Sequence, residues 1–153
     1  MTGARGHGHV YGPIGLGVIL FVAAIPSTWW AVGDLSEPAP ARGELNYILR
    51  PPNVSSQTEM LVGGVALVVG LAVIAGAALG VAQGRWDRAW LPVVALPGVA
   101  AVVIGFTLRV LTAGVAGAHQ GGGLVVLVGV PMVAALLWST GRRALRLGAG
   151  GVD

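Results

Sequence analysis

Four long apolar stretches, separated by arginines, tryptophans or Pro/Gly-rich connectors, dominate the pattern of hydrophobic and polar positions along the chain. They cover about residues 11–33, 60–82, 91–113 and 123–140. At about 1.5 Å of rise per helical residue, each is long enough to cross a hydrocarbon layer of roughly 30 Å. The pattern therefore predicts an all-α integral membrane protein with four transmembrane helices.

The connectors between these stretches predict how the helices are arranged. A longer loop, 34–58, follows the first stretch, whereas the other two connectors are short. Short connectors place consecutive helices side by side and in opposite directions. We expect one four-helix membrane domain over residues 1–153, in the form of an antiparallel bundle.

The first apolar stretch has a second interpretation, as a secretory signal. Ala39-Pro40-Ala41 resembles a small-residue cleavage site. However, an apolar region above about 20 residues exceeds the roughly 7 to 15 of a signal peptide, and proline lies within the site. We therefore favour an uncleaved helix.

Composition supports lipid as the solvent for most of the chain. Hydrophobic residues make up 55% of the sequence and charged residues 10%, and the mean hydropathy is +0.81. A soluble domain is usually about a quarter charged. The net charge of +3 requires no nucleic-acid partner, because arginines flanking membrane spans explain it. All nine basic residues are Arg and Ala, Gly and Val dominate, which is typical of a GC-rich bacterial genome.

The arginines also predict the orientation, since cytoplasmic loops are enriched in basic residues. Placing both termini inside leaves three arginines outside, Arg42, Arg50 and Arg109, and puts six in the cytoplasm: Arg5, Arg85, Arg88, Arg142, Arg143 and Arg146. Four acidic residues, Asp34, Glu37, Glu44 and Glu59, then lie outside. The prediction is N-in and C-in, in the plasma membrane of a bacterium.

Aromatic residues give an independent indication of the span boundaries. Trp29 and Trp30 fall at the outer end of the first span, and four others fall at inner ends: Tyr11, Trp86, Trp90 and Trp138. Indole and phenol rings prefer the membrane interface.

Arg109 is the one charged residue within the predicted spans that is a candidate for a functional site. Counted from Leu91, it lies about 27 Å across the membrane, near the outer boundary. Glu59 opens the second span and Asp34 closes the first on the same side. An interfacial anchor or an ion pair that tethers helices is the simplest reading. The alternative is the mouth of an outward-facing anion or lipid site.

A row of small residues at helical spacing in the second span predicts a packing ridge: Ala72, Gly76, Gly80 and Gly84. Small side chains allow a neighbouring helix to approach closely. Packing within the chain, dimerisation and no special role remain open, because Gly and Ala are common throughout this span.

Cofactor chemistry finds little support in the sequence. The chain has no Cys, which excludes disulfides and thiolate metal sites. His7 and His9 lie in the N-terminus and His119 in a connector, so none is at membrane depth to ligate haem. We expect no cofactor, and a flexible tail in place of a metal site at His7 and His9.

The outer loop contains one segment suited to contacts, Glu44–Leu49, between two pairs of prolines. We expect a short apolar-faced turn that docks on the rim of its own bundle or on a partner.

Two functions of different classes remain open. The first, which we favour, is a non-enzymatic accessory or structural subunit of a membrane complex that contacts lipid and other membrane proteins. The second is a homo-oligomeric small transporter or channel, suggested by prolines within three spans, Pro26, Pro97 and Pro131, because broken helices mark some transport sites. An enzyme is not expected, since no nucleophile has a neighbouring base.

Overall fold

The computed structural model describes residues 8–36, 45–115 and 120–149 of the chain. This part is all-helical, apart from one isolated β-bridge. Its helices are α1 (Gly8–Val32), α2 (Ser56–Ala82), the short 3-10 helix η1 (Arg88–Trp90), α3 (Leu91–Thr112) and α4 (Gln120–Ala149). The four α-helices are long and apolar enough to cross a membrane. The predicted helical fold with four candidate spans is thus confirmed, and the chain is a small multi-pass membrane protein by helix length and composition.

Three helices extend beyond the apolar stretches that predicted them, α1 by three residues at its start and α2 and α4 by more. α2 begins at Ser56 because the Ser55 side chain accepts a hydrogen bond from the Thr58 N–H and caps the helix. α4 continues from Thr140 to Ala149 and carries Arg142, Arg143 and Arg146 on its last turns. Arginine and alanine favour helix, so the loss of apolar character at Arg142 does not end the helix.

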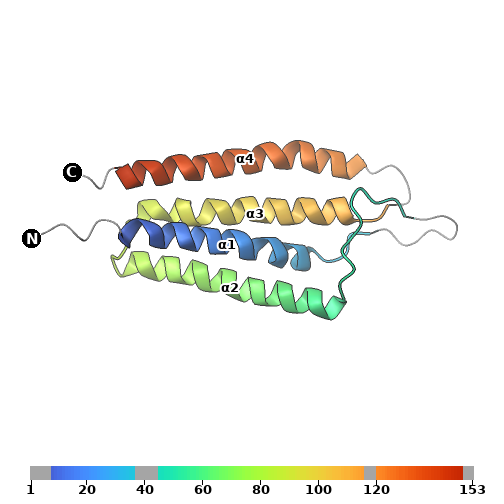
Figure 1. Ribbon diagram of the computed structural model, residues 1–153, viewed down its shortest axis with the longest axis horizontal. Coiled ribbons are helices and arrows are strands. Elements are labelled where there is room, and N and C mark those ends of the chain that lie inside the picture. The colour runs from blue at the N-terminus through green and yellow to red at the C-terminus, as the bar shows by residue number, and fades with distance from the viewer. Residues whose placement is uncertain (1–7, 37–44, 116–119, 150–153) are drawn as a thin grey trace, which may run out of the picture.

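The order of the helices in space differs from their order in the sequence (Figure 1). α1 packs extensively against both α3 and α2, and α4 packs against α3. α2 and α3 make few contacts with each other. The expectation that every pair joined by a short connector lies side by side is therefore met by α3 and α4 and is wrong for α2 and α3, which α1 separates.

The contact between α1 and α3 is close enough to require glycine at two points. A Cβ atom added at Gly17 of α1 would lie 2.9 Å from the carbonyl oxygen of Val93, and one added at Gly105 of α3 would lie 2.8 Å from that of Ile25. Each helix thus presents a glycine to the backbone of the other. Such an approach gives tight van der Waals packing, which replaces the hydrophobic effect as the stabilising term within lipid.

On α2, glycines form notches that receive large side chains. The notch at Gly63 holds Trp30, and the notch at Gly80 holds Trp86, whose ring lies 2.6 Å from the position of an added Cβ atom. Between them, Leu20 of α1 lies 3.7 Å from the position of a Cβ atom added at Gly70 and belongs to the buried core with Val73, Ala77 and Val94. α2 is therefore held along its length by side chains from α1 and by Trp86 of the connector that follows α2.

The three prolines predicted to interrupt spans lie inside helices that continue past them. Pro26 is within α1, Pro97 within α3 and Pro131 within α4. Pro97 is buried, whereas Pro131 is exposed on a helix that contacts the rest of the molecule mainly through α3. In the membrane-spanning setting, the exposed face of α4 contacts lipid or another protein.

Two glycines of the first span, Gly17 and Gly15, provide a matched pair for testing the α1–α3 contact. We expect Gly17→Ala to lower the free energy of unfolding by about 1–3 kcal/mol, because the added methyl group meets rigid backbone. Gly15→Ala, at a position with nothing within 4 Å, is expected to be neutral or to stabilise by up to about 1 kcal/mol through helix propensity. Unfolding by SDS in mixed micelles, followed by circular dichroism, measures both. Effects of the same sign and size would contradict the close contact.

Candidate functional site

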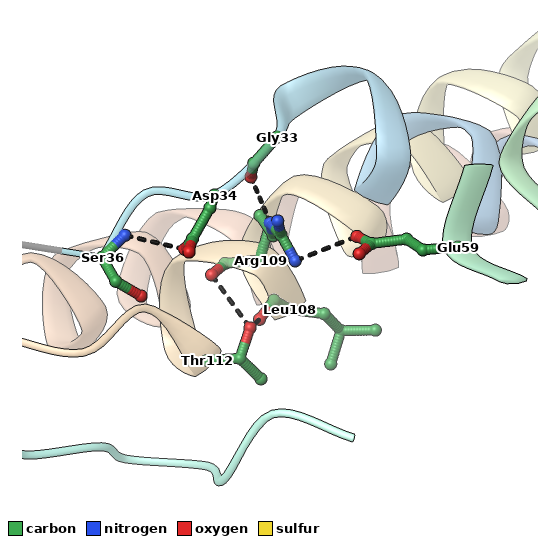
Figure 2. A network of polar contacts seen from close by, with 7 residues as sticks. All are labelled: Gly33, Asp34, Ser36, Glu59, Leu108, Arg109 and Thr112. Carbon is green, nitrogen blue, oxygen red and sulfur yellow. Dashed lines mark hydrogen bonds and ion pairs between the residues drawn. The ribbon is translucent and has the colours of Figure 1, made fainter. Parts of the chain in front are cut away.

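The residues predicted to form an outer ion pair come together at one end of the molecule (Figure 2). Arg109 lies in the last turn of α3, Glu59 in the first turn of α2, and Asp34 directly follows Gly33 at the end of α1. Three helix ends therefore converge on one guanidinium group.

The Arg109 side chain has one partner on α2 and one directly after the end of α1. Its Nη1 atom lies 3.2 Å from Oε1 of Glu59, and its Nε–H donates a hydrogen bond to the carbonyl oxygen of Gly33. Its guanidinium group also lies over the Trp29 ring, 4.9 Å from the centroid, where the negative face of the indole attracts a cation. With the Arg109 side chain only 12% exposed, these contacts replace the water that burial removes.

Asp34 contributes to the site through its charge. Its Oδ1 atom accepts a hydrogen bond of 3.0 Å from the Ser36 N–H. That bond and the Ser36 side chain lower the pKa of the Asp34 carboxyl, and the Arg109 charge lowers it further against the opposing effect of burial. Asp34 is thus ionised at neutral pH. Among the described residues, Glu59 is the carboxylate within ion-pair distance of Arg109.

The outer loop closes over this end of the helices. Asn46 forms an antiparallel bridge with Val115 through hydrogen bonds of 2.8 and 3.0 Å, and the Leu49 N–H donates to the Leu111 carbonyl oxygen at 3.0 Å. Tyr47 lies over Gly114, where an added Cβ atom would be 2.7 Å from its ring. The predicted docking on the chain's own rim is therefore what residues 45–49 do, but through a β-bridge at Asn46 followed by a bend, and not as a helical turn. Glu44 lies outside the described residues.

A pocket of about 540 Å³ lies between the loop and the helix ends. Its polar lining comes from Asp34, Ser36, Ser56, Glu59, Arg109 and Thr112. Its remaining lining is aromatic or apolar: Trp29, Trp30, Tyr47, Pro51, Pro52, Val54 and Ala113, together with Gly33. The volume is in the range of small-molecule sites. The sequence placed the three charged residues at this end, but not the pocket, which depends on how the loop folds back.

The four residues of the predicted packing ridge do not share one environment. Ala72 and Gly76 are exposed, whereas Gly80 is buried against Trp86. Gly84 has φ +67° and ends α2, with the Arg85 N–H donating to the Gly80 carbonyl oxygen, as in the usual glycine cap of a helix. The packing face of α2 contains three buried glycines, Gly63, Gly70 and Gly80, of which only Gly80 belongs to the predicted ridge. A dimer contact through Ala72 and Gly76 stays a prediction.

In the described part of the chain, no group of three or more His, Asp or Glu side chains is close enough to hold a metal ion. The histidine side chains at positions 7, 9 and 119 lie outside the side chains that the structure describes, as does the Ala39–Ala41 segment. Neither the N-terminal tail nor the signal interpretation is tested by the structure.

Comparison with known proteins gives no relative from which to transfer a role. No family model, no curated protein and no solved structure matches this chain. The function of the chain is therefore inferred from the geometry of the Arg109 site and from the character of the helix surfaces.

The pairing of Arg109 with Glu59 predicts a stability effect with a specific rescue. Arg109→Ala is expected to destabilise the fold by about 2 kcal/mol, between the values for an exposed and a buried pair, because it leaves Glu59 and the Gly33 carbonyl without their donor. The charge swap Arg109→Glu with Glu59→Arg should restore part of this loss. Arg109→Lys should not restore it fully, since an ammonium group lacks the Nε donor and the planar face toward Trp29.

Thermal unfolding in detergent measures the stability of these variants. Arg50→Ala is a suitable control, because this arginine lies in the loop between α1 and α2 and is exposed. An Arg109→Ala variant as stable as the control would show that the ion pair does not hold the helix ends.

Proposed function

We propose that this protein is a non-enzymatic accessory or structural subunit of a membrane complex. The observation that supports this most is the state of Arg109. Within the predicted spans of the described helices, Arg109 is the one charged residue. Its charge is already paired with that of Glu59. A membrane protein that moves protons or ions usually keeps titratable groups at membrane depth for that purpose.

The surface of α4 supports contacts with other proteins. This helix contacts the rest of the chain mainly along α3, and large side chains on its other faces are exposed, among them Leu127 at 72% and Trp138 at 69%. We propose that lipid and a partner membrane protein share this face. No catalytic activity, cofactor or nucleic-acid partner belongs to the proposal.

The proposed setting is the plasma membrane of a bacterium, with both termini in the cytoplasm. The four helices would cross it as one antiparallel bundle. The basic end of α4, Arg142 to Arg146, would then meet anionic headgroups on the cytoplasmic side, and the Arg109 pocket would face outward.

A homo-oligomeric transporter or channel is the second candidate. The exposed small residues Ala72 and Gly76 favour it, because they leave α2 a face on which a second copy can pack closely. Conduction would then pass between copies, since four helices enclose little space.

The two candidate functions predict different particles in native membranes. The test is purification in a lipid-preserving polymer, followed by mass measurement of the intact particles. We expect other membrane proteins in a fixed ratio with this chain. A particle that contains only copies of this chain would overturn the accessory role and favour the second candidate.

A variant pair then tests the contact between copies. Gly76→Ile should dissociate a homo-oligomer packed through α2, whereas Gly64→Ile, on the same helix and also with nothing within 4 Å, should leave it intact. Equal dissociation by both would place the contact elsewhere.

The orientation predicts a labelling pattern that the absence of Cys in the sequence makes easy to read. In intact cells, a membrane-impermeant maleimide should label Val54→Cys, in the loop, and should not label Gln83→Cys, at the opposite end of α2, until the cells are opened. Both positions are exposed. The reverse pattern would establish that the termini lie outside.

A further inference from the structure

Two adjoining apolar hollows, here together called the furrow, lie between α1 and α2 on the side of the loop that joins these helices. The upper hollow has a volume of about 270 Å³ and the lower one about 590 Å³. Both are lined by Pro26 of α1 and Val62 of α2, so they meet at these residues. The lower part ends near Val18 and Val69, and its lining is entirely aliphatic, with Pro26 included.

The upper end of the furrow adjoins the polar pocket. The two share four lining residues, Trp29, Pro52, Val54 and Glu59. Trp29 lies at the junction, with Arg109 over its ring. An indole suits this position because it presents an apolar body and a polar edge. A polar cavity next to an apolar furrow matches the polar headgroup and the apolar chain of an amphiphile.

The length of the furrow matches one half of a bilayer. Its lining on α2 runs from Thr58 to Val69, which at about 1.5 Å per residue is roughly 16 Å, about half of a hydrocarbon core of about 30 Å. The furrow is therefore as deep as the acyl chain of a lipid in one leaflet.

The charges of the pocket select among headgroups. Asp34 and Glu59 supply two carboxylates, whereas Arg109 supplies one guanidinium that Glu59 and the Gly33 carbonyl already engage. One negative charge is left in excess. An ammonium group fits this lining better than an anionic headgroup.

We propose that the polar pocket and the furrow together form a binding site for one phospholipid with an amine-bearing headgroup. Its ammonium group lies between the carboxylates of Asp34 and Glu59, and one acyl chain lies along α1 and α2 past Pro26 and Val62. The site requires that the helices cross the membrane. It depends neither on the orientation nor on the accessory role.

Native mass spectrometry of the purified full chain tests the headgroup. The protein is equilibrated with equal amounts of phosphatidylethanolamine and phosphatidylglycerol of the same acyl composition. We expect one molecule of phosphatidylethanolamine to be retained, at about three times the occupancy of phosphatidylglycerol, which is the factor that a half-exposed ion pair supplies. Equal retention, or a preference for phosphatidylglycerol, would overturn the proposal.

Variants separate the two halves of the site. Asp34→Asn, at an exposed position after α1, should remove the preference while lipid is still retained. Val62→Trp should reduce retention of both lipids, because the indole fills the furrow where its two parts meet. Val68→Trp is the matched control, since Val68 is exposed on another face of α2 and lines neither part of the furrow.

Retention by Val62→Trp equal to that of Val68→Trp would show that the lipid binds elsewhere. Thermal unfolding checks that each variant is folded. Should Asp34→Asn prove unstable, the headgroup comparison on the unaltered chain and the Val62/Val68 pair still decide the question. A failure of this site leaves the accessory role untouched, since that role is read from the composition of the native particle.

Discussion

The close approach of α1 and α3 is the constraint on which the rest of the structure depends. Within lipid, burying apolar side chains between helices gains little, because the surrounding chains are equally apolar. Stability must come from packing at short range, and Gly17 and Gly105 allow each helix to meet the backbone of the other. α1 thereby becomes the central helix, with α2 held on it by inserted side chains and α4 added on the far side of α3.

The polar end of the molecule follows from the same arrangement. With α1 and α3 in contact along their length, the end of α3 lies beside the end of α1, and Arg109 reaches the Gly33 carbonyl oxygen. A guanidinium this little exposed must be neutralised, and Glu59 of α2 does so. The loop that joins α1 to α2 then has to cross the end of α3, where it pairs with Val115 and encloses the pocket. Helix packing in the membrane and a cavity at its surface thus have one origin.

Much of this was predictable where one physical rule dominates. Hydropathy alone identifies the four spans, and the facing ends of the spans bring Arg109 and Glu59 to one side. The order of the helices was not predictable, because 26 glycines in 153 residues leave several faces of α2 suitable for close packing. Which face is used depends on side chains from elsewhere, above all Trp30 and Trp86. Both were read as interfacial anchors, and both also fill glycine notches. The pocket depends on a loop whose prolines exclude regular structure but do not specify a path.

The central position of α1 has a consequence for the order of assembly during synthesis. α1 enters the bilayer first, but the helix that it packs against most closely is α3, which is complete only about 80 residues later, from Val32 to Thr112. At roughly 5–20 residues per second, this delay is about 4 to 16 s. Throughout that time the glycine face of α1 is open to lipid and to other newly made helices. α2 can pack on α1 during this period, but the face of α1 that carries Gly17 has no partner from its own chain until α3 is made, and other membrane helices can compete for it.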